Sequence, residues 1–237
     1  MRRISCEQCP VRGSSVCGGL PLSLLDEFRA CTTTAIYKPR QALFFEGAPA
    51  TGLYLVCHGA VKVYQSDRFG RDYIAGIAHP GDVLGEIGTE EGTTCSTSAE
   101  ATVETQATFL SREHLARFLQ LHPSAGLRLV TALCAALAGA RRKTRDFAFK
   151  SAEGRLAELV LRLTERATTR ASQGAAHFTL AYSRREIAEM IGVSPETAIR
   201  LFGGLRDRHL LSLEARELTI HDPERLRRIA HHCDVEG

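Results

Sequence analysis

One stretch near the C-terminus decides the fold: REIAEMIGVSPETAIRL, residues 185–201. Gly192 can supply the left-handed backbone conformation that a tight turn needs. Ser194 can cap the helix that follows, and Pro195 suits the first position of that helix. The stretch therefore predicts a helix-turn-helix, whose second helix is shaped to enter the major groove of DNA.

The second predicted helix has a face that is free to contact bases, formed by Glu196, Ile199 and Arg200. Arg200 can donate two hydrogen bonds to a guanine, and Glu196 can accept one from cytosine N4. Ile199 has no hydrogen bond to offer and would contact a thymine methyl group. The alternative is an ordinary ion pair between Glu196 and Arg200 on a solvated face, since they lie four residues apart. The spacing of the glycine turn favours base reading.

Downstream of this stretch, residues 210–213 and 217–220 predict two short strands joined by residues 214–216. A hairpin directly after the second helix makes a winged version of the helix-turn-helix.

Upstream, apolar residues recur three and four positions apart at Leu127, Val130, Cys134 and Leu137. Such a narrow stripe suits a seam between two helices better than burial in a globule. We therefore expect residues 123–148 to form a dimerisation helix.

A basic run, Arg141-Arg142-Lys143-Thr144-Arg145, closes this helical stretch, and Phe147-Ala148-Phe149 opens another helical pattern. We expect the hinge between two domains at this point. In a dimer the basic residues would lie beside their symmetry copies and repel them.

Residues 44–110 hold short apolar segments separated by glycines at regular intervals, which favours a β-barrel or β-roll. The predicted fold class is α+β. In chain order we expect a cysteine-bearing N-terminal segment (1–19), a β-roll sensor domain (20–122), the dimerisation helix (123–148) and a winged helix-turn-helix DNA-binding domain (149–237).

Length and composition fit this arrangement. The chain has 237 residues, enough for two modest domains, and a formal net charge of +3, which permits nucleic-acid binding. We find no run of about 18 apolar residues and no apolar signal core, so we expect a cytoplasmic protein with no membrane partner. Eight cysteines in such a chain indicate thiols or metal ligands. No nucleophile elbow, phosphate loop or HExxH pattern occurs, so we expect no enzyme.

These residues, together with Gly81-Asp82 and Gly85-Glu86-Ile87-Gly88 in the predicted β-roll, resemble the CRP/FNR superfamily of bacterial transcription regulators. The resemblance covers nearly the whole chain and implies a homodimer on palindromic, TGA-type sites in double-stranded promoter DNA, with RNA polymerase as a partner. It implies DNA contact by Glu196, Thr197 and Arg200, with Glu196 and Arg200 on the G·C step. FNR-like members carry serine where this chain has Ile199, so we expect the outer base of the half-site to depart from FNR-like operators.

Cyclic-nucleotide binders of this superfamily hold the cyclic phosphate with an arginine–serine pair, and the corresponding stretch here is Cys95-Ser96. The pair that meets the adenine in cyclic-AMP receptors falls at Ala140-Arg141. Without the arginine, the phosphate lacks its counter-charge. We therefore expect no cyclic AMP.

The N-terminal segment offers another sensor in Cys6, Cys9 and Cys17. Thiolates at this short spacing can wrap one metal centre. The spacing is similar to that of the FNR/FnrL/FixK-type branch, whose members with a full cysteine set carry an oxygen-labile [4Fe–4S] cluster. The branch takes its fourth cysteine from a strand near Thr108, where this chain has none.

Cys95 is the first choice as a substitute fourth ligand, because it lies in the same stretch of the β-roll. Cys31, Cys57 and Asp146 are the alternatives. Four other interpretations stay open: a structural zinc site, a thiol–disulfide sensor, a remnant that binds nothing, and a regulator whose β-roll holds haem or a small organic effector.

Overall fold

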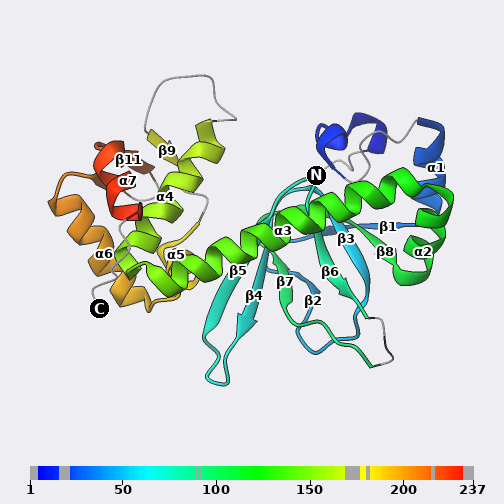
Figure 1. Ribbon diagram of the computed structural model, residues 1–237, viewed down its shortest axis with the longest axis horizontal. Coiled ribbons are helices and arrows are strands. Elements are labelled where there is room, and N and C mark those ends of the chain that lie inside the picture. The colour runs from blue at the N-terminus through cyan, green and yellow to red at the C-terminus, as the bar shows by residue number, and fades with distance from the viewer. Residues whose placement is uncertain are drawn as a thin grey trace. The chain divides into compact units, whose positions relative to one another are not determined.

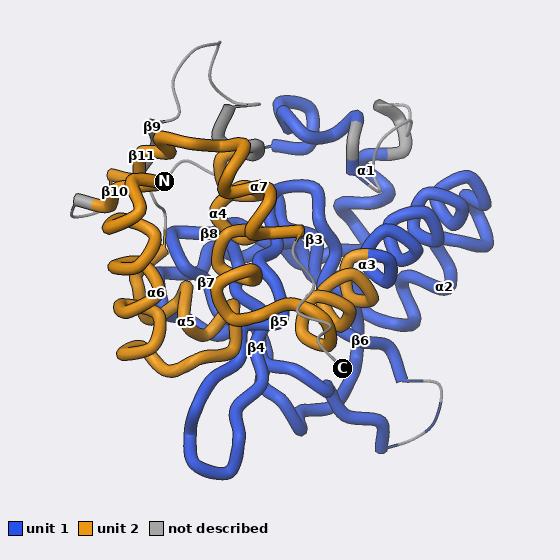
Figure 2. Tube along the Cα trace, turned by 60° about the vertical axis from the view of Figure 1, so that its left-hand side comes forward, with its two compact units in different colours: residues 1–138 blue, residues 139–237 orange. Residues whose placement is uncertain are grey.

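The computed structural model describes residues 5–15, 22–88, 90, 92–168, 177–179, 182–214 and 217–231. The chain divides into two compact units, Met1–Ala138 and Gly139–Gly237, as Figure 2 shows. The α+β class is confirmed, with a β-roll in the first unit and a winged helix-turn-helix in the second.

The β-roll consists of two antiparallel four-stranded sheets, with strand orders β1-β8-β3-β6 and β2-β7-β4-β5. A cluster of buried apolar side chains from both sheets joins them, including Val56, Val61 and Ala99. The predicted strands between residues 44 and 110 are confirmed, and two earlier ones precede them. The strands are β1 (Thr33–Tyr37), β2 (Ala42–Phe44), β3 (Thr51–His58), β4 (Val61–Ser66), β5 (Asp72–Ala78), β6 (Val83–Ile87), β7 (Ser98–Ala101) and β8 (Thr105–Ser111).

A second apolar cluster lies on the other face of the β1-β8-β3-β6 sheet, where Leu53 and Leu55 of β3 point away from Val56 because side chains alternate along a strand. This cluster joins three helices to the sheet: α1 (Leu22–Ala30), α2 (Arg112–Leu121) and the start of α3 (Pro123–Phe149). Figure 1 shows α1, α2 and the beginning of α3 gathered beside β8 and β3. The start of the long helix is therefore fixed by the β-roll's own core.

The long helix α3 extends through residues 141–149, where we had expected a hinge. It ends at Phe149, and α4 (Ala152–Thr168) begins after Lys150 and Ser151. Lys143 is half-buried, and its burial, with Arg162 of α4 nearby, lowers its pKa to about 8. At least one residue of the basic run thus faces its own protomer.

Along the outer side of α3, the predicted stripe is exposed: Leu127 is 71%, Val130 55% and Leu137 51% accessible, and Cys134 is exposed beside them. By length and composition alone, α3 is the one helix in the described part of the chain that could cross a membrane. Contiguous exposed apolar surface marks an interaction site.

In its described residues the second unit contains the end of α3, helices α4 to α7 and a small antiparallel sheet of order β10-β11-β9. The predicted hairpin is confirmed as β10 and β11, whereas β9 and α7 were not foreseen. Its elements after α4 are β9 (His177–Thr179), α5 (Arg184–Ile191), α6 (Pro195–Asp207), β10 (Leu211–Glu214), β11 (Glu217–Ile220) and α7 (Pro223–His231).

Candidate functional site

The turn between α5 and α6 has the backbone that the sequence predicts. Gly192 ends α5 in the left-handed conformation, with φ of 67°. Ser183 and Glu186 cap the start of α5 reciprocally, and at its end the Gly192 backbone N–H donates to the Ala188 carbonyl. The side chain of Ser194 accepts a hydrogen bond from the Thr197 backbone N–H at 3.2 Å and begins α6.

Glycine is also required at position 192 because the neighbouring side chains leave no room for a Cβ. A Cβ placed on it would lie 2.6 Å from the ring of Phe147, in the last turn of α3. The Arg155 guanidinium lies over the same ring at 4.7 Å, and its Nε donates to the Ile191 carbonyl at 2.9 Å. The end of α3 thus supports the turn of the helix-turn-helix directly.

A buried charge cluster holds the same junction. The Lys150 Nζ lies 3.1 Å from Asp146 Oδ1 at the end of α3 and 3.3 Å from Glu158 Oε2 of α4. The side chains of Lys150 and Asp146 are each 6% exposed. Asp146, one alternative metal ligand, therefore already has a buried cationic partner.

The candidate base-contacting side chains lie together on the outer face of α6. Glu196, Ile199 and Arg200 are exposed, while Thr197 is half-buried and Ala198 is fully buried against α5. The backbone N–H of Glu196 and the Ser194 hydroxyl hold the pKa of the Glu196 carboxyl below its usual range. No ion pair between Glu196 and Arg200 occurs in the described structure, so the solvated-pair alternative has no geometric support.

In the first unit, thiols from two segments line one hollow of about 410 Å³. Cys6 begins the short helix η1 (Cys6–Gln8), Cys9 follows it, and Cys57 lies on β3. Arg12 and Arg29 also line the hollow, so the thiols face cationic groups.

Two of these thiols have perturbed acidities. Burial raises the pKa of the Cys6 thiol, and the Arg29 guanidinium opposes that shift. Burial likewise raises the pKa of Cys57, against a lowering by the hydrogen bond with Thr108, while Cys6 and Cys9 raise it further. The three sulfurs are therefore close enough to influence one another's charge.

The structure does not bring Cys95 to this hollow, which corrects our first choice of fourth ligand. Cys95 is 6% exposed, and its Sγ lies 4.0 Å from the Pro49 carbonyl, in the loop that precedes β7. Its position near Thr108 along the chain does not translate into nearness in space, because β7 and β8 belong to different sheets. Cys57, which we ranked lower, lines the hollow.

The remaining candidate cysteine ligands are Cys17 and Cys31. Cys17 lies outside the described residues. Cys31, after α1, packs against the helical apolar cluster and does not line the hollow. Within residues 5–15, 22–88 and the later described segments, no group of three or more His, Cys, Asp or Glu side chains is already arranged to hold a metal ion.

At the expected phosphate-binding position, the structure shows an internal contact. Glu86 Oε1 accepts hydrogen bonds from the Ser96 hydroxyl at 2.7 Å and from the Ser96 N–H at 2.9 Å. The one serine of the stretch is therefore already bound to a carboxylate of β6.

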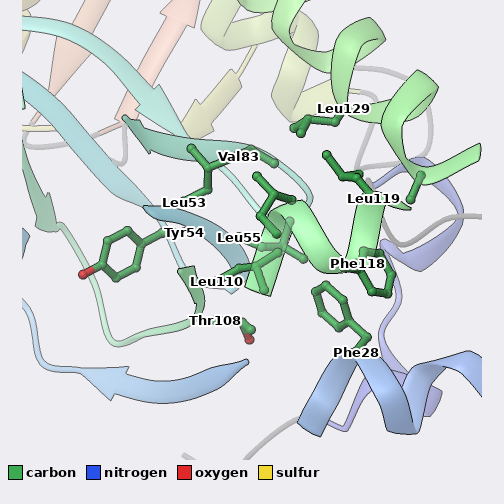
Figure 3. A pocket seen from close by; sticks show the side chains of 12 residues that line it. Phe28, Leu53, Tyr54, Leu55, Val83, Thr108, Leu110, Phe118, Leu119 and Leu129 are labelled. Carbon is green, nitrogen blue, oxygen red and sulfur yellow. The ribbon is translucent and has the colours of Figure 1, made fainter. Parts of the chain in front are cut away.

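A second cavity lies under the start of α3 and is almost wholly apolar (Figure 3). It measures about 40 Å³, and Phe118, Leu119 and Leu129 close one side of it. Phe28, Leu55 and Thr108 line both this cavity and the cysteine-lined hollow, so the two spaces share a wall. Its size suits a few atoms and not a haem, because one water occupies about 30 Å³ in the liquid.

Comparison with known proteins gives the family. Residues 34–122 match the cyclic nucleotide-binding domain, and residues 154–229 match the Crp-like helix-turn-helix domain. The chain is 29% identical over 188 residues to the CRP-like cAMP-activated global transcriptional regulator of Mycobacterium tuberculosis, covering 79% of this chain and 84% of that protein.

A longer match is to the transcriptional activatory protein AadR of Rhodopseudomonas palustris, 28% identical over 226 residues, or 95% of this chain and 93% of AadR. Among solved structures, FixK2 from Bradyrhizobium japonicum has a TM-score of 0.71 and 26% identity over 85% of this chain and 98% of FixK2. The relatives are transcription regulators and not enzymes. With a cyclic nucleotide-binding domain followed by a Crp-like helix-turn-helix, the chain belongs to the CRP/FNR superfamily of transcription regulators.

Proposed function

We propose that the protein is a dimeric transcription regulator that binds TGA-type palindromic promoter sites and is controlled by a [4Fe–4S] cluster on its N-terminal cysteines. The observation that carries the sensor part is the hollow in which Cys6, Cys9 and Cys57 converge from two distant segments. The DNA-binding part rests on the exposed face of α6.

For DNA reading, Glu196 and Arg200 are exposed and unengaged with each other on the first turns of α6. A carboxylate and a guanidinium on one such face can pair with the cytosine and the guanine of one G·C step. Ile199, 52% exposed between them, offers only apolar contact and selects the neighbouring base through a thymine methyl.

For dimerisation, the exposed stripe of α3 is the supporting feature. Covering Leu127, Val130, Cys134 and Leu137 with the same stripe of a second copy removes apolar surface from water on both sides. A two-fold dimer would set two copies of α6 one turn of DNA apart, as a palindrome requires. Residues 123–148 are thus the proposed dimerisation segment.

For the cluster, the cysteine thiols at this site are ligands of the type that an iron–sulfur cluster needs. Cys6 and Cys9 are held by η1 and the residue after it, Cys57 enters from β3, and Cys17 belongs to the same motif outside the described residues. Thiolates are the ligands that iron–sulfur clusters take. When bound, such a cluster supplies a centre that oxygen or nitric oxide can destroy.

The link from the hollow to α3 passes through one apolar cluster. Cys6 packs against the cluster that contains Phe28 of α1 and also Ala125 and Leu129 of α3. Holding Cys6 and Cys9 in place therefore stabilises the surface on which α3 begins. At its other end, α3 supports the DNA-reading turn through Phe147 and Gly192.

The DNA part is tested by competition binding on a palindrome with two TGA half-sites. Exchanging the G·C pair for A·T in both half-sites should weaken binding strongly. Equal affinity for the two duplexes would contradict base reading by α6.

The sensor part is tested by anaerobic purification. We expect iron and acid-labile sulfide in nearly equal amounts. A Soret band would favour the haem regulator instead, zinc without sulfide would favour a structural site, and metal-free protein that forms a disulfide would favour thiol sensing.

A further inference from the structure

Resting on the proposed function, we propose that Cys57 of β3 is a protein ligand of the metal centre held by Cys6 and Cys9. A thiol ligand of this chain thus comes from the strand next to β8, and Cys95 has no part in the site.

The local geometry of β3 directs Cys57 into the hollow. The pairing of β3 with β8 is regular from Gly52 to Val56 and shifts register between Val56 and His58, so Cys57 sits at a bulge. Bulges re-aim a side chain relative to a regular strand. Cys57 is half-buried and lines the hollow together with Cys6 and Cys9.

Thr108 occupies the position on β8 where related regulators are expected to carry their fourth cysteine. Its Oγ1 lies 3.3 Å from the Cys57 Sγ and 2.9 Å from the Thr34 hydroxyl of β1. All three side chains line the same hollow. The thiol therefore lies one strand over from the expected position and faces the same space, since neighbouring strands are about 4.8 Å apart.

The other thiols of the described structure are placed elsewhere. Cys95 packs beside the Pro49 carbonyl, with Glu86 as the charged group that affects it. Cys31 packs into the helical cluster, and Cys134 is exposed on α3. Among the cysteines that the structure describes, only Cys57 shares a cavity with Cys6 and Cys9.

The nearby charges suit a centre bearing anionic thiolates. Arg12 and Arg29 line the hollow, and the one carboxylate of the motif, Glu7, is paired with Arg29 at 3.5 Å between Oε1 and Nη1. Soft sulfur donors and cations, without a free carboxylate from Glu7, favour a thiolate-bound iron centre over a hard-cation site.

The test compares four full-length proteins after anaerobic reconstitution with iron and sulfide: wild type, Cys57→Ser, Cys95→Ser and Cys57→Ser with Thr108→Cys. Iron, sulfide and the visible absorption of the cluster are measured for each, and circular dichroism confirms the fold. We expect Cys57→Ser to retain under about a tenth of the wild-type iron and sulfide, because a complete set has four thiolates. Cys95→Ser should match the wild type.

The double variant returns a thiol to the same hollow from β8, so we expect it to regain most of the cluster. This rescue also separates loss of a ligand from misfolding of Cys57→Ser. Wild-type cluster content in Cys57→Ser, or its loss in Cys95→Ser alone, would overturn the assignment while leaving the proposed function intact. A wild type that takes up no iron and sulfide would overturn the proposed function and this assignment with it.

Discussion

The helix-turn-helix and the cysteine-lined hollow are built in opposite ways. The caps, turn and exposed face of the helix-turn-helix all come from residues 183–201, one continuous stretch. The hollow takes its side chains from η1, α1, β1, β3 and β8, which meet only when the sheet has formed. Local chain chemistry therefore specifies the helix-turn-helix, whereas strand pairing specifies the cysteine-lined hollow. The helix-turn-helix should respond to single local changes, and the hollow to changes in which strand carries the thiol.

The largest effect is expected at the helix-turn-helix itself. Arg200→Ala removes one bidentate contact in each half-site, so the Kd for the palindrome should rise about 1000-fold, roughly 4 kcal/mol for two contacts. Fluorescence anisotropy at fixed salt measures it. Arg227→Ala, an exposed arginine on α7, is the control and should change the Kd by less than about threefold. Equal effects of the two would show that Arg200 serves only as a general positive charge.

The next largest effect is expected at the junction between α3 and α4. Lys150→Ala leaves the carboxylates of Asp146 and Glu158 without their shared cation. Removing one partner of a buried ion pair costs about 3 kcal/mol, so urea unfolding should show that loss. Lys38→Ala, at an exposed lysine, should change stability by less than about 0.5 kcal/mol. Similar losses in both variants would mean that the cluster does not stabilise the unit.

Substitutions at two glycines of the helix-turn-helix should have smaller effects on stability, and these effects should be of opposite sign. Gly192→Ala forces a left-handed alanine against Phe147 and should destabilise the protein by about 2 kcal/mol. Gly203→Ala, in the interior of α6 with nothing within 4 Å of its Cβ, should stabilise by up to about 1 kcal/mol. Thermal unfolding of both variants measures these changes. The same sign for both would contradict the described turn.

The smallest effect concerns specificity. Ile199→Ser replaces an apolar contact with a hydroxyl and should change the preferred outer base of the half-site by about 1 kcal/mol, without altering the G·C step. Selection from a library of half-sites measures the preference. An unchanged preference would indicate that Ile199 does not reach a base.

The sequence predicted local features well and spatial neighbours poorly. Gly192, Ser194 and the exposed side chains of α6 follow from capping and helical periodicity, which act within one turn. The expected dimerisation helix, 123–148, ends one residue before α3 does, but the hinge was expected within residues 141–149, where the helix continues because the stretch contains neither proline nor glycine. Cys95 was preferred over Cys57 by its nearness to Thr108 along the chain.

The structure separates Cys95 from the hollow for a physical reason. Cys57 and Thr108 are 51 positions apart, and they meet because β3 pairs with β8. Cys95 lies before β7, whose hydrogen bonds lead into the other sheet. Spacing patterns contain no information on which strands pair. A cysteine near the end of a continuous apolar strand, residues 53–58, was the signal that could have favoured Cys57.

In the proposed function, the thiols of the β-roll unit control the DNA affinity of the helix-turn-helix. The most direct measurement follows DNA binding and cluster absorbance in one sample of wild-type protein, first metal-free, then reconstituted without oxygen, then exposed to air. We expect the affinity for the palindrome to rise as the cluster forms and to fall again as air removes it. An affinity that is the same in all three states would contradict it.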